Sequence, residues 1–309
     1  MKPIVTLTLN PAIDGACSAE LVRPTHKIRN SDERYDPGGG GINVSRVVIE
    51  LGGASLPVYL AGGATGAVLD ELLRARGITG RAVAIHDHTR VSHAVFERST
   101  GREFRFVPEG PLIRPEEWAA CLATLEALDF DWLVASGSRP RGLDDACYVE
   151  IGALARRKGA RLVLDTSGPA LGAALAAGGV HLAKPSSGEF QALIGEEFGD
   201  RDALAAAAVE FVRGGGVEML AVTMGHEGAL LATRDGARFL APPEVEVKSA
   251  TGAGDSFTGA MVWALAEGWE PARAFALGVA AGSATVLAPG TDLCRRADVW
   301  RLREEMGAD

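Results

Sequence analysis

Cysteine is scarce in this chain, and the spacing of the few cysteines argues against two classes of protein. The chain has 309 residues and four cysteines, which are Cys17, Cys121, Cys147 and Cys294. Four thiols in a chain of this length are too few for a disulfide-stabilised scaffold. None of them has the spacing of a metal-binding pair. We therefore expect neither a disulfide framework nor a cysteine metal site.

Positive charge and long apolar runs are also lacking. There are 31 Lys and Arg against 40 Asp and Glu, which gives a net charge of −9. Nucleic-acid binding depends largely on neutralising phosphates, so this balance argues against such a partner but leaves room for a local basic pocket. No apolar run approaches the roughly 20 residues that a membrane-spanning helix needs. The opening stretch MKPIVTLTLN is too short and interrupted for a secretory signal. We expect a cytoplasmic protein that binds neither nucleic acid nor membrane.

The chain does contain short apolar runs that alternate with helical patterns. Helical patterns occur, for example, at residues 144–159 and 201–216. This alternation predicts an α/β fold in which helices cover both faces of a mainly parallel sheet. Ligands bind at the carboxyl ends of such strands, so the polar residues that end the runs are candidate site residues. The apolar runs are residues 4–10, 132–138, 161–168, 181–186 and 219–225.

Residues 16–36 and 88–108 depart from this pattern, because neither stretch has helical periodicity. TRVSHAVFERSTGREFRFV (89–107) alternates on both sides of a Ser-Thr-Gly turn, which predicts a hairpin. We expect both stretches to form a small accessory sheet within a single domain of residues 1–309. Such a sheet would serve as a lid over the site or as a dimer surface.

The stretch SATGAGDSFTGA (249–260) places glycines and a carboxylate at the predicted start of a helix. Apolar residues follow Asp255 at helical spacing from Phe257 to Leu265, and Gly268 can end the helix. Unpaired amides and the helix dipole make such a start an anion site. Asp255 is either a helix-capping charge, or a general base that takes a hydroxyl proton while the amides hold a phosphoryl group.

Three common nucleotide motifs are missing from the sequence. A dinucleotide fingerprint needs glycine where this stretch has Phe257, and a Walker A loop needs a Gly-Lys pair that the chain does not contain. The His-Arg-Asp loop of protein kinases is also absent. If the protein is a kinase, it is therefore of another type.

A second glycine cluster, DPGGGGINVSRVVIELGG (36–53), precedes another predicted helix. Ordering four consecutive glycines costs considerable backbone entropy, and a turn needs only one or two. One interpretation is that a ligand packs against the bare backbone, with Asn43 binding a hydroxyl near the helix start. The other is a tight turn from strand to helix.

Together the two clusters resemble the ribokinase-like PfkB family of carbohydrate kinases. That family has a Gly-Gly motif followed by Asn in its N-terminal half and a Gly-Ala-Gly-Asp motif in its C-terminal half. Both motifs occur here, in that order and more than two hundred residues apart. The resemblance starts at TLTLNPAID (6–14) and covers essentially the whole chain. It implies a three-layer αβα sandwich with a small β-sheet lid.

Within the family, the chain is most similar to the minor bacterial 6-phosphofructokinases. The matching stretches include AGGATG (61–66), FRFVPEG (104–110), SGSRPRG (136–142) and AAGSATVLAPGT (280–291). This implies ATP-dependent phosphorylation of fructose 6-phosphate. Fructose 1-phosphate and tagatose 6-phosphate remain alternative acceptors, although TRVSHAV lacks the Asn-Val-Lys pattern typical of their kinases. A catalytically silent nucleotide or sugar sensor is the alternative from another class.

The resemblance also implies roles for matched residues. Asp255 would be the general base, and the amides of Gly252, Ala253 and Gly254 would form the anion hole. The residues implied for the sugar hydroxyls are Asp14, Gly39, Gly40 and Asn43, and those for the sugar phosphate are Lys27, Arg90, Arg105 and Ser138. The residues implied for the nucleotide are Lys184, Ser186, Thr223, Gly225, Gly228 and Ser283.

Two ions and a homodimer are further implications. Mg²⁺ would accompany ATP and be held by Glu189 through a water molecule. A monovalent cation such as K⁺ would bind at Ser249, Thr251, Thr285 and Gly290. The chain departs from the family pattern at Ser186, where Asn is usual, and at Asp292, where a basic residue is common. The accessory strands imply a homodimer formed through the lid sheet.

Overall fold

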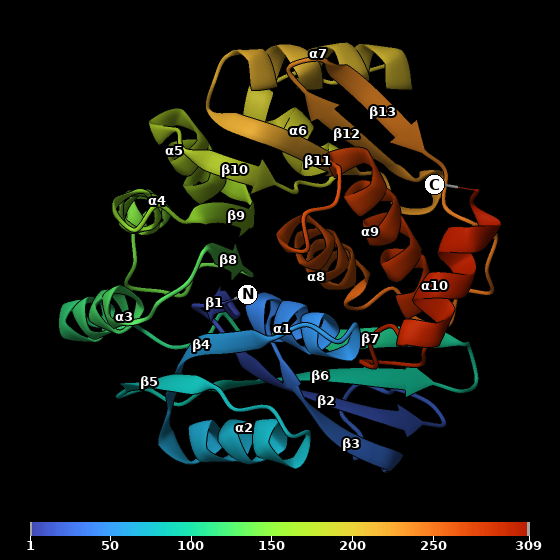
Figure 1. The fold of residues 1–309 in the computed structure, drawn as a ribbon. Coiled ribbons are helices and arrows are strands. Elements are labelled where there is room, and N and C mark those ends of the chain that lie inside the picture. Colours follow the sequence, from blue (N-terminus) through green and yellow to red (C-terminus); the bar gives the residue numbers. More distant parts are fainter. Residues whose placement is uncertain (1, 308–309) are drawn as a thin grey trace.

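The computed structural model describes residues 2–307, whose largest feature is a nine-stranded sheet (Figure 1). In spatial order the strands are β13 (Gly236–Leu240), β12 (Ala229–Thr233), β11 (Val217–Thr223), β10 (Val180–Ala183), β9 (Arg161–Asp165), β8 (Trp132–Ser136), β1 (Ile4–Thr8), β4 (Ser55–Gly62) and β5 (Arg81–Ile85). The seven strands from β11 to β5 are parallel to one another, whereas β12 pairs antiparallel with β11, and β13 pairs antiparallel with β12.

Helices cover both faces of this sheet, because its strands carry apolar side chains on both sides. Successive residues of β1 show the alternation: Val5 and Leu7 pack into one core cluster and Ile4 into another. One face is covered by α3 (Pro115–Ala127), α4 (Cys147–Arg157), α5 (Gly168–Ala177), α6 (Ser187–Ile194) and α7 (Arg201–Arg213). The other is covered by α1 (Gly40–Glu50), α2 (Gly63–Ala75), α8 (Ala253–Ala266), α9 (Pro271–Thr285) and α10 (Arg296–Glu305). The predicted three-layer αβα sandwich is confirmed.

The small separate sheet is also present, at the lower right of Figure 1. Its strands are β3 (Asn30–Gly38), β2 (Ala12–Ala19), β6 (Arg90–Glu97) and β7 (Arg102–Phe106), in that order. The predicted hairpin is the antiparallel pair β6 and β7, and its turn contains Gly101 at φ 69°. β2 begins at Ala12, four residues before the predicted stretch, because it runs on almost directly from β1.

The strand order creates a crevice at the carboxyl ends of β1 and β8. From β1 the chain first builds β4 and β5 on one side, and later builds β8 to β11 on the other. At such a switch point the two loops leave in opposite directions and open a binding crevice. The first turn of α1 lies there. An added Cβ on Gly40 would overlap Ser136 Oγ, and one on Gly41 would lie 2.6 Å from the Leu7 carbonyl oxygen.

Those contacts explain the run of glycines through packing against protein atoms. Gly39 has φ 110°, a conformation that favours glycine, and a Cβ on Gly38 would overlap the Asp14 carboxylate. All four Cβ directions are therefore filled by the protein itself. The tight strand-to-helix turn accounts for the cluster, and a ligand against bare backbone is not needed to explain it.

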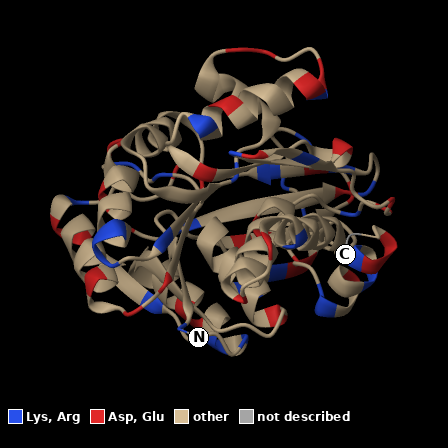
Figure 2. Cartoon of the chain, turned by 45° about the horizontal axis from the view of Figure 1, so that its top comes forward, with Lys and Arg blue, Asp and Glu red and all other residues tan. Residues whose placement is uncertain are grey.

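Charged residues are interspersed around the molecule. Figure 2 shows Lys and Arg side by side with Asp and Glu on helices and loops, while the central sheet is mostly uncharged. Among residues 2–307, no helix combines the length and the apolar character needed to cross a bilayer.

Candidate active site

Two helix N-termini meet beside the crevice. α8 begins after Gly252, which has φ 79°, and Asp255 lies in its first turn. Asn43, in the first turn of α1, donates from Nδ2 to Asp255 Oδ2 at 2.8 Å. The first amides of a helix have no intrahelical acceptor, and its dipole places partial positive charge there. The site therefore combines an anion-binding helix start with a carboxylate.

A buried ion pair lies next to this helix start. Lys184 follows β10, and its Nζ lies 3.0 Å from Asp165 Oδ1. The second oxygen of Asp165 accepts a hydrogen bond from Thr258 of α8 at 2.9 Å. A Cβ on Gly254 would lie 3.3 Å from Lys184 Nζ, so the ammonium group reaches the first turn of α8.

Asp165 is a site residue that the sequence analysis did not name. It is the last residue of β9, so it fits the general expectation that polar residues ending the strands reach the site. No motif marks it, because its neighbours in sequence take no part in the site. Only the pairing of β9 with β8 and β10 brings it opposite Asp255 and Lys184.

Asp255 is poised to exchange a proton near neutral pH. Burial raises the pKa of Asp255 to about 7, and the nearby Asp165 carboxylate also raises it. The hydrogen bond from Asn43 and the charge of Lys184 act in the opposite direction. A carboxyl group with a strongly raised pKa in a cleft is a candidate general base.

A cavity of about 520 Å³ opens on one side of the α8 start. It is lined by several of the predicted nucleotide residues and by two of the three residues of the predicted anion hole: Thr223, Gly225, Gly228, Ser283, Ala253 and Gly254. Gly225 begins the short helix η1 (Gly225–Glu227). Gly228 has φ 119°, and a Cβ there would overlap the Leu240 carbonyl oxygen, so this loop requires glycine.

The rest of this cavity is mostly apolar, apart from His226 and Glu244, and was not predicted. Its wall comes largely from the segment between β13 and α8 and from α9, including Pro242, Val245, Val247, Val279 and Val286. Flat apolar walls with a few polar groups suit an aromatic base. The part of this wall between β13 and α8 could not be predicted, because that segment follows neither strand nor helix periodicity.

A smaller pocket lies on the other side of the α8 start, under the small sheet. Asp14 and Arg105 line it together with Thr251 and Gly290. Burial raises the pKa of Asp14, and a hydrogen bond from Ser92 opposes this change. A carboxylate beside a guanidinium group can accept from hydroxyls while the cation binds an anion.

Arg90 and Ser138 line neither pocket and form hydrogen bonds within the protein. The Arg90 guanidinium donates to the carbonyl oxygens of Asn10 and Pro108, both at 2.9 Å, and its buried Nε has no partner. Asn10 Nδ2 in turn donates to Ser138 Oγ at 3.2 Å. Asn10, which was not predicted, therefore connects the ends of β1 and β8.

Some predicted residues lie elsewhere. Lys27 is exposed in the loop between β2 and β3 and lines neither pocket. Ser186 and Glu189 form a capping box at the start of α6, with Ser186 N donating to Glu189 Oε2 at 2.7 Å. Residues 2–307 contain no group of three or more His, Cys, Asp or Glu side chains that could hold a metal ion.

The residues implied for a monovalent cation are only partly gathered. Ser249 Oγ donates to the Gly290 carbonyl oxygen at 2.8 Å, and Thr251 N donates to Ser249 Oγ at 3.2 Å. Thr285 Oγ1 instead bonds to Ser256 Oγ at 2.6 Å and donates to the Ala281 carbonyl oxygen at 3.0 Å. Its hydroxyl is therefore occupied within the protein.

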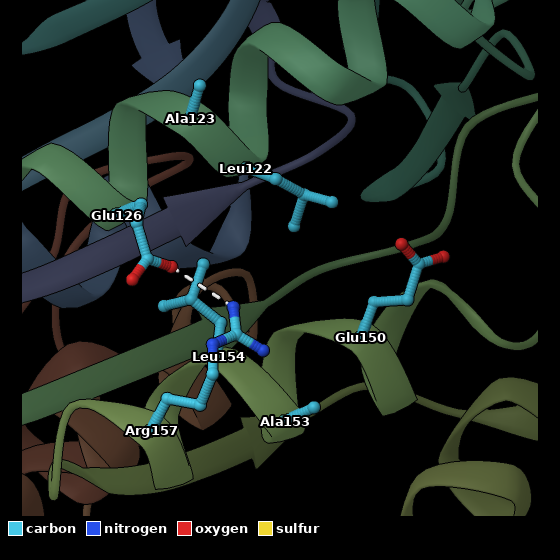
Figure 3. Close-up of a pocket in the computed structure, with 7 residues that line it drawn as sticks. All are labelled: Leu122, Ala123, Glu126, Glu150, Ala153, Leu154 and Arg157. Atoms are coloured by element: carbon cyan, nitrogen blue, oxygen red, sulfur yellow. Dashed lines mark hydrogen bonds and ion pairs between the residues drawn. The ribbon is translucent and has the colours of Figure 1, made fainter.

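A further hollow between α3 and α4 has no comparable chemistry (Figure 3). Its charged residues include Arg157, whose Nη2 lies 3.1 Å from Glu126 Oε2, and its other lining is mostly aliphatic. Both helices cover the sheet face opposite α8. This hollow is a surface groove distant from the site.

The chain resembles known proteins over nearly its whole length. A family model described as the pfkB family carbohydrate kinase matches residues 7–298. The chain belongs to the PfkB family of carbohydrate kinases. It is thus a phosphotransferase that acts on a sugar hydroxyl.

Individual relatives of this PfkB kinase are phosphofructokinases. The ATP-dependent 6-phosphofructokinase isozyme 2 of Mycobacterium tuberculosis is 42% identical over 307 residues, which cover 98% of this chain and 90% of that protein. A 1-phosphofructokinase of Xanthomonas campestris is 34% identical over 266 residues, with coverages of 84% and 83%. The crystal structure of Escherichia coli phosphofructokinase-2 in complex with fructose-6-phosphate has a TM-score of 0.94 at 35% identity, covering 99% and 100%. Other structures of that enzyme are a complex with potassium and a tetrameric inhibited form.

Replacing Asp255 should change stability in a pH-dependent way. The pKa of Asp255 is about 7 in the folded protein and about 3.9 in an unfolded chain. The folded state therefore holds this proton more tightly, and the resulting stability is lost as pH rises through 7. At pH 8, the free energy of unfolding of Asp255→Asn should exceed that of the natural protein by a few kcal/mol, because each unit of pKa difference corresponds to about 1.4 kcal/mol. The difference should shrink toward pH 5.

Denaturant unfolding at pH 5 and pH 8 would measure this difference. Asp235→Asn, in an exposed turn, is the matched control and should show the same small effect at both pH values. A difference for Asp255→Asn that does not grow with pH would contradict the raised pKa.

Proposed function

We propose that this PfkB kinase is an ATP-dependent 6-phosphofructokinase, which converts fructose 6-phosphate and ATP into fructose 1,6-bisphosphate and ADP. The observation that carries this proposal is the position of Asp255 in the first turn of α8, next to Ala253 and Gly254, which line the large cavity, and close to Thr251, which lines the small polar pocket. Two of its relatives with that activity in their names align over nearly the whole chain. With ATP as a substrate, we expect the enzyme to act in the cytoplasm.

The two pockets divide the substrates between them. The adenine and ribose of ATP occupy the large cavity, so that its phosphates approach the amides of Gly252, Ala253 and Gly254. The sugar binds at the small pocket, which has to widen from about 20 Å³ to hold it, and Asp14 and the remaining N–H of Asn43 hold its hydroxyls there. Arg105 binds the phosphate that the sugar already carries, since a guanidinium fork matches phosphate oxygens.

Asp255 then acts as general base. Its carboxylate takes the proton of the C1 hydroxyl as that oxygen attacks the γ-phosphorus. The bond between the γ-phosphorus and the β,γ-bridging oxygen breaks on the opposite side, and ADP leaves. Catalysis of this kind is mostly positioning and charge stabilisation, which the α8 amides and Lys184 supply.

Two ions accompany this proposal. Mg²⁺ enters as part of the MgATP substrate and keeps several waters, so a single carboxylate contact through water is enough. Glu189 fits that contact because only its Oε2 is used in the capping box. A monovalent cation fits the oxygens of Ser249 and Gly290, and an E. coli relative has a structure in complex with potassium.

The alternative acceptors keep the same mechanism. One relative, at 34% identity, is a 1-phosphofructokinase. Fructose 1-phosphate and tagatose 6-phosphate are therefore the next candidate acceptors. A silent sensor of nucleotide or sugar would bind both ligands without turnover, and the raised pKa of Asp255 gives such a protein no advantage.

We also propose a homodimer formed through the small sheet. Large apolar side chains are exposed on and beside this sheet, notably Ile28, Tyr35, Phe96, Phe106 and Val107. An apolar face of this kind normally marks an interaction surface. Lys27 lies in the loop of the same sheet, so a partner copy would change its surroundings.

An assay of ADP release against a panel of acceptors tests the activity. The panel contains fructose 6-phosphate, fructose 1-phosphate, tagatose 6-phosphate, fructose and ribose. We expect a clear preference for fructose 6-phosphate, and a loss of turnover of at least about 100-fold in Asp255→Asn with substrate binding retained. Asp235→Asn should keep full activity.

Other results of this assay would change the proposal in specific ways. Preference for another phosphosugar would change only the proposed acceptor and leave the mechanism as it is. Unchanged turnover in Asp255→Asn would reject the general base. Binding of MgATP and sugar with no turnover in the natural protein would favour the sensor.

Sedimentation velocity at micromolar concentration tests the assembly. The natural protein should sediment as a dimer or larger species. Phe106→Glu should shift it toward monomer, because a charge would be buried at the apolar surface. Val68→Glu, at an exposed position of α2, is the control and should leave the assembly intact. A natural protein that is only monomeric would contradict the dimer.

A further inference from the structure

A second concentration of positive charge lies outside both pockets, in a cavity of about 360 Å³. Its walls are the C-terminal half of α1, the end of α2 and the segment that leads into α10. Each wall contributes one arginine: Arg46, Arg76 and Arg295. Like charges repel one another, so three guanidinium groups around one cavity are notable in a chain of net charge −9.

Two of these arginines form no salt bridge among the described residues. Arg76 forms an ion pair with Asp36. Among residues 2–307, neither Arg46 nor Arg295 forms a salt bridge, taken as a nitrogen–oxygen distance of up to 4.0 Å. Burial lowers the pKa of Arg46 and repulsion by Arg76 lowers it further, while the carboxylates of Asp36, Asp292 and Asp14 raise it. An anion in the cavity would relieve this repulsion.

The two acidic side chains that line the cavity are engaged with other groups. Glu50 Oε1 accepts the main-chain N–H of Arg296 at 2.9 Å. Asp292 Oδ2 lies 3.5 Å from Arg34 Nη1 in the small sheet. Each carboxylate therefore has a contact of its own, and neither forms a salt bridge with Arg46 or Arg295.

We propose that this cavity is a binding site for a small phosphorylated anion. Arg46 and Arg295 would be its main ligands, and Arg76 would complete the ring of charge. The planar fork of arginine binds two oxygens of a phosphate at once, and a tetrahedral dianion can accept from three directions. The cavity is separate from the proposed substrate pockets, since it shares no lining residue with the large one and only neighbours the small one through the segment 290–292.

Two successive hydrogen bonds connect this cavity to Asp255. Arg46 Nη1 donates to Asn43 Oδ1 at 3.0 Å, and Asn43 Nδ2 donates to Asp255 Oδ2 at 2.8 Å. By donating to Oδ1, Arg46 therefore keeps the Nδ2 atom of Asn43 turned toward Asp255. An anion that draws the guanidinium group into the cavity weakens this orientation and lowers turnover. This second step rests on the proposed function, whereas anion binding does not.

Equilibrium binding of inorganic phosphate tests the site without any turnover. The variant is Arg295→Glu, an exposed position whose side chain makes no hydrogen bond at the start of α10. Arg81→Glu, on the exposed part of β5, matches it in charge change. Any phosphate bound at the α8 start is common to all three proteins, so the comparison isolates the cavity.

We expect the natural protein and Arg81→Glu to bind one more phosphate than Arg295→Glu, or to bind it at least about tenfold more tightly. The thermal midpoints of the three should agree, which excludes unfolding as the cause. Equal binding by all three, or no binding by any, would overturn the site.

The effect on turnover is measured separately, with MgATP and fructose 6-phosphate both saturating. Added phosphate should lower kcat in the natural protein and in Arg81→Glu, and have a smaller effect in Arg295→Glu. An equal response in all three would overturn the route through Arg46 while leaving the binding result to stand. Absence of all turnover would instead count against the proposed function.

Discussion

The hydrogen bond between Asn43 and Asp255 joins the two helices on which the site depends. It connects the first turn of α1 to the first turn of α8, residues that are more than two hundred positions apart in sequence. Both helix starts then direct their positive dipole ends toward one place. The glycines before α1 make this possible, because a side chain on Gly40 or Gly41 would push the helix away from β1 and β8.

The charges around that bond explain why a carboxylate can be buried there. Asp255 shares its surroundings with the Asp165 carboxylate and the Lys184 ammonium group, and the Asp14 carboxylate raises its pKa further. One cation does not neutralise two buried anions, so one carboxyl tends to keep its proton to a higher pH. The Lys184–Asp165 pair is bonded at 3.0 Å, and the raised pKa therefore falls on Asp255. This excess of buried negative charge destabilises the protein above neutral pH, where Asp255 is ionised. It also gives the Asp255 carboxyl a pKa suited to proton transfer.

Much of the fold was predictable from the sequence, and part of the site was not. The alternation of apolar runs predicted the sheet, and the helical spacing after Asp255 predicted α8, because both patterns are local. Asp165 and Asn10 were missed, since their place beside Asp255 and Ser138 depends on strand order, which periodicity does not contain. The apolar wall of the large cavity was missed for a related reason, as its segment has no regular pattern. Asn43 was expected to bind a hydroxyl, which stays a prediction, and its hydrogen bonds to Asp255 and Arg46 could not be read from the sequence.

The pH dependence of kcat/KM for fructose 6-phosphate tests the central claim most directly, because it reports the ionisation of the base in the free enzyme. With Asp255 as general base, the value should rise about tenfold per pH unit at low pH and level off above pH 7, near the pKa of about 7. In Asn43→Ala the break should move to higher pH, because the hydrogen bond that lowers this pKa is lost. A profile that stays flat between about pH 5 and 8 in the natural enzyme, or a break that Asn43→Ala does not move, would contradict the account.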